Sequence, residues 1–442
     1  MEISDHALAN LLKRKIARNP EDKEKMKSVF YCGSRVLKGG GAGYEPGVFV
    51  LVNNETAQFW GTTTCKNAWI CPTCSAKMMS KYATDVACAI DAMKARGQVA
   101  FMITFTVPHT SGMSCHETTE ILFDTWARFH IRGNHNLKNE TGKNGRTWKN
   151  KDPFATFCEE FNCKQRIRVG EYTWGKHGWH PHFHCLFFVD KKKLQMVKGW
   201  ADTLNERWLT LAKRATIKIW TKLFPDKTKE QIEQRAQIMF DKADKVGSKG
   251  AYISVDDKGK VIEQKSSMYI CGWGADRELT GNYKAKATNE GHMTPYQILQ
   301  KAQQAEEFDE EERWLNLFME FARATKAKNY KRISFGTNGL RKIIDEYKLT
   351  NEYRETLKKK FTQQAENVGK WRILCWFNES QWSKICLLDR EHNIKHTILQ
   401  LAFHEGRDAV ANYLREFCEI HLIERENYTS TVCKKIWGVE AA

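Results

Sequence analysis

The sequence predicts an α+β fold with an antiparallel sheet, a cysteine-rich N-terminal module and a helical C-terminal region. Two neighbouring segments alternate in the manner of a β-hairpin, four cysteines lie near the N-terminus, and helical patterns dominate the chain beyond Thr294. The 442 residues suffice for two or three domains. We expect an N-terminal helix and the cysteine module in residues 1–98, a sheet domain in 99–290 and a helical region in 291–442.

The charge balance favours a polyanionic partner. The chain has 70 lysines and arginines against 53 aspartates and glutamates, a net charge of +17, which indicates nucleic acid before a membrane surface. The 14 cysteines are spread over the chain, and the N-terminus carries charges where a signal peptide has its apolar core. We therefore expect a protein of the reducing cytoplasm. The longest apolar stretch, Val99–Val107, is too short to span a membrane.

A long amphipathic helix precedes the first strand of the predicted sheet. The first 30 residues predict a charged helix, and apolar residues at intervals of three and four predict another over Ser75–Arg96. Val99–Val107 is rich in β-branched and aromatic residues and stops before Pro108, which is typical of a buried strand. Lys164–Trp174 and Trp179–Val189 alternate on either side of a glycine-containing turn, and this pattern predicts a hairpin.

Helical patterns dominate most of the chain after this hairpin. Lys191–Gly250 combines such patterns with a basic excess, and a short hairpin is expected over residues 252–263. Thr294 followed by Pro295 is typical of a helix start. Before the hairpin, residues 130–152 are polar, and we expect them to form an exposed loop.

Three histidines on the second strand of the hairpin mark the candidate site. Side chains of a strand alternate between faces, so His180, His182 and His184 share one face and Phe183 points to the other. Imidazoles held on a strand can bind a divalent cation, and Glu171 on the partner strand is the candidate third ligand. Mixed imidazole and carboxylate ligands suit Mn²⁺ or Mg²⁺. The alternative is a set of polar side chains on a half-exposed sheet face.

The segment around these histidines resembles a known enzyme family. Residues 170–184, GEYTWGKHGWHPHFH, are similar to the second motif of the HUH endonucleases in plasmid and phage rolling-circle replication initiators. Residues 102–109, MITFTVPH, are similar to their first motif, a strand that ends in a histidine. Shorter resemblances lie at residues 294–299 and 334–342, so the resemblance covers about residues 60–345.

The third motif of this family is a helix with a nucleophilic tyrosine, and the segment around Tyr269 is similar to it. Family members often have lysine three residues later; Gly272 stands there, and Lys265 is the candidate replacement. Relatives with two catalytic tyrosines space them by four residues, but Lys265 and Trp273 occupy those positions. The chain therefore resembles the single-tyrosine class, in which a carboxylate can activate water, and Glu278 is the nearest candidate.

The resemblance implies a ferredoxin-like antiparallel nuclease core that uses Mg²⁺ or Mn²⁺. In such initiators the tyrosine attacks a DNA phosphodiester, keeps the 5′-phosphate and releases a 3′-OH that primes rolling-circle replication, and the ends are later rejoined. The implied partners are single-stranded or origin DNA and a host helicase and polymerase. The implied compartment is the cytoplasm of a prokaryote that carries the plasmid or phage, and no membrane partner is expected. The alternatives are an HUH transposase or relaxase, and a DNA-binding regulator without catalysis.

The N-terminal cysteines predict a structural zinc site. Cys71 and Cys74 form a pair with zinc-type spacing, and two further cysteines precede them. One alternative is a redox-active pair, and another is a site in which Cys158 or Cys163 replaces Cys32. The four predicted ligands are Cys32, Cys65, Cys71 and Cys74.

A basic stretch after the histidine strand is the candidate DNA-binding surface. Phosphate contacts from such side chains bring affinity without sequence information. A solvated helix face explains the same pattern, and both interpretations stay open at this point. The stretch includes Lys191, Lys192, Lys193 and Arg214, with further lysines at positions 213, 218 and 222.

Overall fold

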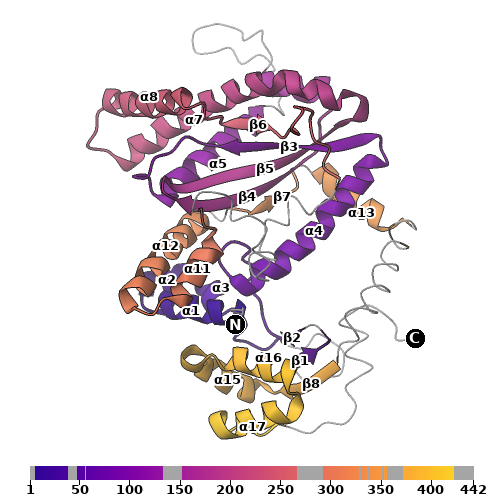
Figure 1. The fold of residues 1–442 in the computed structure, drawn as a ribbon, viewed down its shortest axis with the longest axis vertical. Coiled ribbons are helices and arrows are strands. Elements are labelled where there is room, and N and C mark those ends of the chain that lie inside the picture. Colours follow the sequence, from indigo (N-terminus) through magenta and orange to yellow (C-terminus); the bar gives the residue numbers. More distant parts are fainter. Residues whose placement is uncertain are drawn as a thin grey trace. The chain divides into compact units, whose positions relative to one another are not determined.

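The computed structural model describes residues 5–37, 47–54, 56–132, 152–265, 292–327, 330–336, 338–350 and 372–422, together with residues 353 and 355. The chain divides into two compact units, the larger one formed by residues 76–348 and the smaller one by residues 1–75 and 349–442 (Figure 1). Among the described residues, none of the helices is both long and apolar enough to cross a membrane.

The larger unit is built on a five-stranded antiparallel sheet. Its strands are β3 (Gln98–Thr106), β4 (Arg166–Gly175), β5 (Gly178–Asp190), β6 (Ala251–Ile253) and β7 (Ile333–Ser334). The order β6-β3-β5-β4-β7 puts β5, the strand with the histidines, at the centre (Figure 1). β4 and β5 form the predicted hairpin, and Gly178 begins β5 with a φ of +85°, which favours glycine. The sheet confirms the predicted α+β class.

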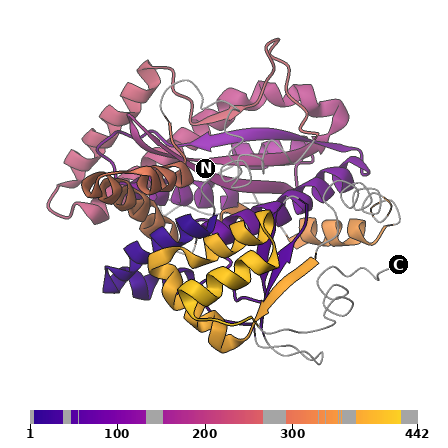
Figure 2. The ribbon, with the colours of Figure 1, turned by 60° about the horizontal axis from the view of Figure 1, so that its bottom comes forward.

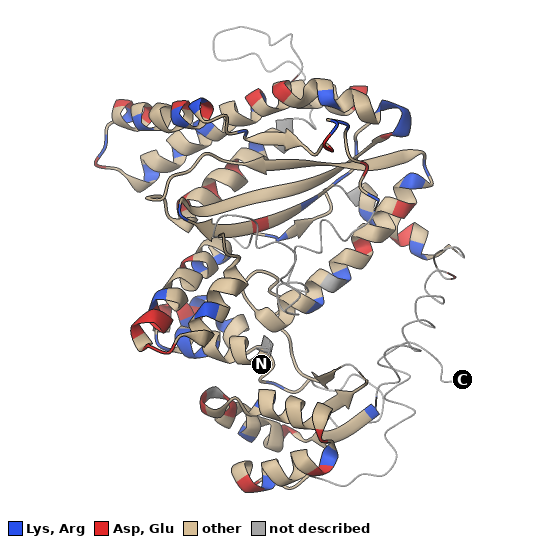
Figure 3. Cartoon of the chain, in the orientation of Figure 1, with Lys and Arg blue, Asp and Glu red and all other residues tan. Residues whose placement is uncertain are grey.

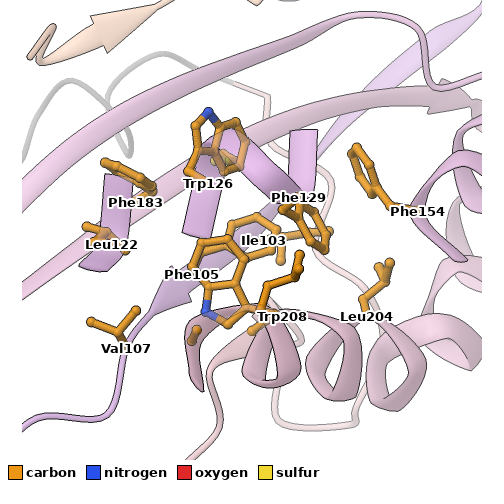
Figure 4. Packing of buried hydrophobic residues seen from close by; sticks show 14 of the residues in the cluster. Ile103, Phe105, Val107, Leu122, Trp126, Phe129, Phe154, Phe183, Leu204 and Trp208 are labelled. Carbon is orange, nitrogen blue, oxygen red and sulfur yellow. The ribbon is translucent and has the colours of Figure 1, made fainter. Parts of the chain in front are cut away.

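Helices cover one face of this sheet and enclose the main hydrophobic core. They are α5 (Cys115–Arg132), α6 (Pro153–Glu160) and α7 (Ala201–Leu223). Figure 4 shows Phe105 on β3 against Trp208 on α7, and their ring centroids are 4.6 Å apart. Full burial of such a side chain contributes roughly 1.5–3 kcal/mol. Phe183 on β5 also lies in this core, so the alternation of the strand turns His182 and His184 to the opposite face.

The other helices of the larger unit follow the sequence patterns closely. α11 begins at the predicted cap, where Thr294 and Gln297 exchange side-chain hydrogen bonds with each other's backbone amides. Asp85 on α4 accepts hydrogen bonds from Arg341 and Lys348 on α13, at 2.8 and 2.5 Å. The helices are α4 (Pro72–Lys94), the 3₁₀ helix η1 (Lys191–Trp200), α8 (Lys229–Lys245), α11 (Pro295–Gln304), α12 (Phe308–Lys326) and α13 (Asn338–Lys348).

The smaller unit joins the two ends of the chain in one core. It has a three-stranded antiparallel sheet of order β2-β1-β8, from β1 (Val48–Val52), β2 (Ala57–Trp60) and β8 (Arg372–Phe377). The N-terminal helices are α1 (Asp5–Ala17), α2 (Pro20–Lys25) and α3 (Lys27–Phe30). Helices α15 (Glu379–His392), α16 (Ile394–His404) and α17 (Arg407–Cys418) follow β8 and pack side by side (Figure 2).

This division differs from the three consecutive regions expected from the sequence, with boundaries near residues 98 and 290. The physical reason is the pairing of β8 with β1, which attaches the last part of the chain to the N-terminal module. Helix α13, expected in the C-terminal region, belongs instead to the larger unit because its cations pair with Asp85 on α4. Residues 133–151, most of the predicted exposed loop, lie outside the described part of the chain.

Candidate metal centre

Glu171, His182 and His184 converge on the face of the sheet opposite the aromatic core. Glu171 pairs with His182 across the β4–β5 hairpin. The Oε2 atom of Glu171 lies 3.1 Å from Nε2 of His182 and 3.0 Å from Nε2 of His184. One ligand atom from each residue lies within 4.8 Å of the others, as a shared cation requires. The structure thus brings together the three residues that sequence reasoning selected.

The far nitrogen of each imidazole already has a partner. Nδ1 of His184 lies 3.0 Å from the Thr104 hydroxyl on β3, and Nδ1 of His182 lies 3.4 Å from the His180 carbonyl. A carbonyl only accepts, so the contact with the His180 carbonyl is made by the tautomer of His182 that carries its proton on Nδ1, and in that tautomer the lone pair of Nε2 can bind a cation. Such outer contacts fix the tautomer and the ring orientation of metal-binding histidines. Sequence reasoning missed Thr104, although the register of β3 against β5 places it opposite His184.

Electrostatics prepare the same group of side chains for a cation. Burial opposes the charge on Glu171, but the adjacent His182 and His184 outweigh it and hold the pKa of that carboxyl well below its usual range. Burial also lowers the pKa of His184, with a smaller contribution from His182. The site therefore combines an ionised carboxylate with an imidazole that stays neutral at pH 7, which is the protonation state that metal binding needs.

His180 is not part of this triad and lies beside His109, the histidine that ends the first motif. The two ring centroids are 4.9 Å apart. Burial lowers the pKa of His180 well below its usual value, and the nearby His182, His109 and His292 lower it further. Sequence reasoning missed His292, which is distant in sequence but occupies the space that a side chain at Gly175 would need.

Two of the predicted catalytic residues, Tyr269 and Glu278, lie outside the described residues. Lys265 is described at the end of the segment that follows β6. Its neighbour Gln264 donates a backbone hydrogen bond of 2.8 Å to Ala100 on β3. Ala100 lies four residues before Thr104 on that strand, so Gln264, the neighbour of Lys265, is about 13 Å along the sheet from Thr104.

The predicted DNA-binding residues are separated from the triad. Lys191, Lys192 and Lys193 begin η1 after the end of β5, so Lys191 lies about 23 Å along the strand from His184. Lys191 and Lys192 are exposed, whereas Lys193 bonds the Glu160 carbonyl. Arg214 is exposed on α7. Figure 3 shows charges of both signs along α7 and α8, so this surface is not uniformly basic.

The four N-terminal cysteines form a second cluster, in the smaller unit. The Sγ atom of Cys32 lies 3.4 Å from that of Cys74 and 3.7 Å from that of Cys71, and those of Cys65 and Cys74 are 3.5 Å apart. A tetrahedral zinc with bonds of about 2.3 Å separates its sulfur ligands by about 3.8 Å. Thiol hydrogen bonds from the other three cysteines lower the pKa of Cys32. All four are free cysteines, so the cluster is compatible with structural zinc.

Residues from the C-terminal segment hold the chain next to this cluster. The Gly33 carbonyl accepts hydrogen bonds from the Trp382 indole at 3.2 Å and from the Lys395 ammonium at 3.4 Å. Lys13 on α1 donates to the Cys32 carbonyl at 2.7 Å. Cys158 and Cys163, the alternative ligands, belong to the other unit, where Cys163 is buried beside Cys158 near Arg166.

Comparisons with known proteins give distant and partial similarity. The chain is 25% identical over 156 residues to "Protein rep" of Streptomyces lividans, covering 30% of this chain and 31% of that protein. It is also 25% identical over 152 residues to "Neomycin resistance protein" of Streptomyces cyanogenus, covering 32% of this chain and 34% of that protein. The chain thus matches about a third of the length of these curated relatives. No family model and no solved structure matches it.

Proposed function

We propose that this protein is a rolling-circle replication initiator that nicks one DNA strand by tyrosine attack. The observation that carries the proposal is the convergence of Glu171, His182 and His184 on one sheet face, with the two Nε2 atoms 3.1 and 3.0 Å from the same carboxylate oxygen. The partial similarity to "Protein rep" and the net charge of +17 support a role at DNA. The HUH-type motif at residues 170–184 supports the chemistry.

The donor set fits Mn²⁺ or Mg²⁺. One carboxylate and two neutral imidazoles carry a single negative charge, so a divalent cation leaves the centre positive and open to a phosphate. When bound, the cation supplies Lewis-acid polarisation of a non-bridging phosphate oxygen. Glu171 supplies the negative charge that attracts the cation. Thr104 and the His180 carbonyl orient the imidazoles of His184 and His182.

Tyr269 is the proposed nucleophile. Its phenolic oxygen forms a bond to the phosphorus of a DNA phosphodiester while the bond from phosphorus to the 3′-oxygen breaks, and the departing oxygen takes up a proton. The products are a 5′-phosphotyrosine link and a 3′-OH that primes synthesis. Because the link retains a phosphodiester, attack by a new 3′-OH reverses the reaction and rejoins ends without a nucleotide cofactor.

The position of Lys265 supports this assignment. Tyr269 lies four positions after Lys265, and four extended residues span at most about 14 Å, which is of the same order as the distance along β3 between Gln264 and the triad. Lys265 is the proposed cation that favours the ionised phenol, and Glu278 is the proposed base for the water that ends the cycle. Single-stranded or origin DNA is the proposed substrate, a host helicase and polymerase are the proposed partners, and the cytoplasm is the proposed compartment.

We also propose that Cys32, Cys65, Cys71 and Cys74 hold one structural Zn²⁺. The spacing of their sulfurs, close to that of a tetrahedral site, supports this assignment. The ion would join the segment of Cys32 to the start of α4, and the bonds to the Gly33 carbonyl would tie the C-terminal helices to it.

A covalent adduct tests the nicking proposal. The purified protein is incubated with single-stranded origin DNA and Mn²⁺ and analysed on a denaturing gel. We expect an adduct for the wild type and none for Tyr269→Phe. Tyr252→Phe is the matched control, because Tyr252 on β6 pairs with Thr104 and its side chain faces the same side of the sheet as the triad. An adduct that survives Tyr269→Phe but disappears with Tyr252→Phe would show that Tyr252, and not Tyr269, is the nucleophile.

The same experiment separates the other classes of function. DNA binding without an adduct in any variant contradicts the nuclease proposal and favours a non-catalytic regulator. A transposase or relaxase forms the same adduct, so a second assay supplies a supercoiled plasmid with a polymerase and asks whether the released 3′-OH is extended around the circle. Extension is expected for an initiator.

A further inference from the structure

A cavity lies on the helix-covered side of the sheet, away from the Glu171 triad. Its volume is about 540 Å³, and residues of α5, β4, α7 and β7 line it. Arg166 and Arg168 line it from β4, in register with Phe187 and Cys185 on the core face of β5. Glu171 is an odd number of residues away from both, so it faces the other side. We propose that this cavity is a second site, which binds the phosphate of a nucleotide.

The two arginines are the first reason. Arg166 is 2% exposed and Arg168 is 6% exposed, and neither forms an ion pair within the described part of the chain. Nε and Nη2 of Arg166 and Nε of Arg168 are buried without a hydrogen-bond partner among the described residues. Burial lowers the pKa of Arg168 to about 10. A guanidinium that has lost its water is costly until an anion restores its hydrogen bonds.

Aromatic rings compensate only part of that cost. The Arg168 guanidinium lies 4.3 Å from the Phe183 ring centroid and 4.9 Å from that of Phe123, and Arg166 lies 5.8 Å from that of Phe154. Such contacts stabilise a cation through the ring faces. They leave Nε and Nη2 of Arg166 and Nε of Arg168 unsatisfied, while Nη2 of Arg168 donates to the Lys331 carbonyl at 2.9 Å. Unsatisfied guanidinium N–H groups suit the oxygens of a phosphate.

Further cations stand at the same cavity. Lys218, Lys222 and Lys331 also line it, so five basic residues face two acidic ones, Glu120 and Asp124. The Asp124 carboxylate is already compensated, because Lys218 lies 2.6 Å and Arg128 lies 2.5 Å from its oxygens. The exposed Lys222 and Lys331 remain to meet a ligand at the mouth of the cavity.

The aromatic lining narrows the ligand class to a nucleotide. Trp126, Phe123 and Tyr330 line the cavity, and the rings of Phe123 and Tyr330 stack at 3.8 Å with an angle of 18°. Aromatic side chains of this kind stack on bases, while guanidinium groups take the phosphate. The cavity volume lies within the usual range of small-molecule sites. The shared chemistry is a 5′-phosphate on a flat base, supplied either by a free mononucleotide or by one residue of a DNA strand.

Calorimetric titration without added Mg²⁺ or Mn²⁺ tests this site independently of cleavage. The probes are thymidine 5′-monophosphate, thymidine and a short oligothymidylate. We expect binding of the monophosphate or the oligonucleotide, with an affinity about tenfold lower in the double variant Lys222→Ala/Lys331→Ala. The Lys331 carbonyl, which accepts a bond from Arg168, survives the substitution. The control Lys242→Ala/Lys245→Ala removes the same charge from exposed positions on α8 and leaves the affinity unchanged.

The outcomes decide both the site and the source of the nucleotide. If the Lys222→Ala/Lys331→Ala variant binds the monophosphate more weakly than the wild type does, a free nucleotide is a sufficient ligand. If it loses affinity for the oligonucleotide alone, the ligand is a DNA strand. Equal binding of thymidine and its monophosphate contradicts a phosphate site. The proposal is also overturned when neither the monophosphate nor the oligonucleotide binds, or when the Lys222→Ala/Lys331→Ala and Lys242→Ala/Lys245→Ala variants bind with the same affinity. Arg168→Lys, checked for folding by thermal melting, keeps the charge but removes the paired donors, and it is expected to weaken binding as well.

Discussion

Glu171 on β4 lies directly opposite His182 on β5, with its Oε2 atom 3.1 Å from the imidazole Nε2. His184, two residues further along the same face, reaches the same oxygen. The register of the hairpin creates this relationship, because a slip by one residue would turn Glu171 into the aromatic core. The tight turn that ends at Gly178 fixes that register. A local feature of the sequence thus determines the geometry of the centre.

Thr104 should set the affinity of the centre for a cation without touching it. Its hydroxyl lies 3.0 Å from Nδ1 of His184, so Thr104→Val frees that ring to rotate. We expect Mn²⁺ affinity to fall about 10- to 100-fold, measured by calorimetry. Thr104→Ser keeps the hydroxyl and should stay within a few-fold of the wild type. Equal affinities in the Val and Ser variants would argue against this orienting role.

The pH dependence of Mn²⁺ binding follows from the shifted pKa of His184. Burial lowers it from the ordinary value of about 6.5, so the ring is neutral above that pH and a proton competes with the cation only below it. The affinity should be constant from about pH 8 to 6.5 and should decrease as the pH falls further. A decrease that is already under way between pH 8 and 7 would show that the imidazole is not held neutral.

The cysteine cluster should contain one zinc ion per chain. Cys32→Ala removes one of the four sulfurs, and we expect lower zinc content in elemental analysis and a lower melting temperature, because structural zinc contributes folding free energy. Cys158→Ala tests the alternative ligand and should retain zinc. Full zinc occupancy in the Cys32 variant, together with a loss of zinc in the Cys158 variant, would show that Cys158 and not Cys32 is the zinc ligand.

DNA binding should weaken steeply with salt, because phosphate contacts release counterions. Each phosphate contact to a single strand contributes about −0.7 to the slope of log K against log salt. If exposed Lys191 and Lys192 both contact phosphates, Lys191→Ala/Lys192→Ala reduces the magnitude of the slope by about 1.4, as measured by fluorescence anisotropy. An unchanged slope would show that Lys191 and Lys192 at the start of η1 do not contact DNA phosphates.

The convergence of Glu171, His182 and His184 could be predicted from the sequence because it depends on local rules. The alternation of His182, Phe183 and His184 fixes their faces, and the short hairpin places Glu171 opposite them. The start of α11 at Thr294 follows from its capping box in the same way. In each case, the residues that interact are close in sequence.

Long-range packing could not be predicted in this way. The pairing of β8 with β1 joins residues more than 300 positions apart, and no local pattern indicates it. The same holds for Thr104 behind His184, 80 residues away. Arg166 and Arg168 alternate on β4 like exposed residues, and only the packing of α5 and α7 buries them. Tertiary contact, more than composition, determines these positions.

The most direct test of the account is Mn²⁺ binding to the triad, measured by calorimetry on the full chain. We expect one Mn²⁺ per wild-type chain and a loss of at least tenfold in affinity for both Glu171→Gln and His182→Ala, while the cysteine cluster, with its soft thiolate ligands, does not compete. His180→Gln is the control, because the backbone carbonyl that orients His182 is retained, and it should bind as the wild type does. Unchanged binding in the Glu171 and His182 variants would contradict the proposed metal centre and the nicking mechanism that depends on it.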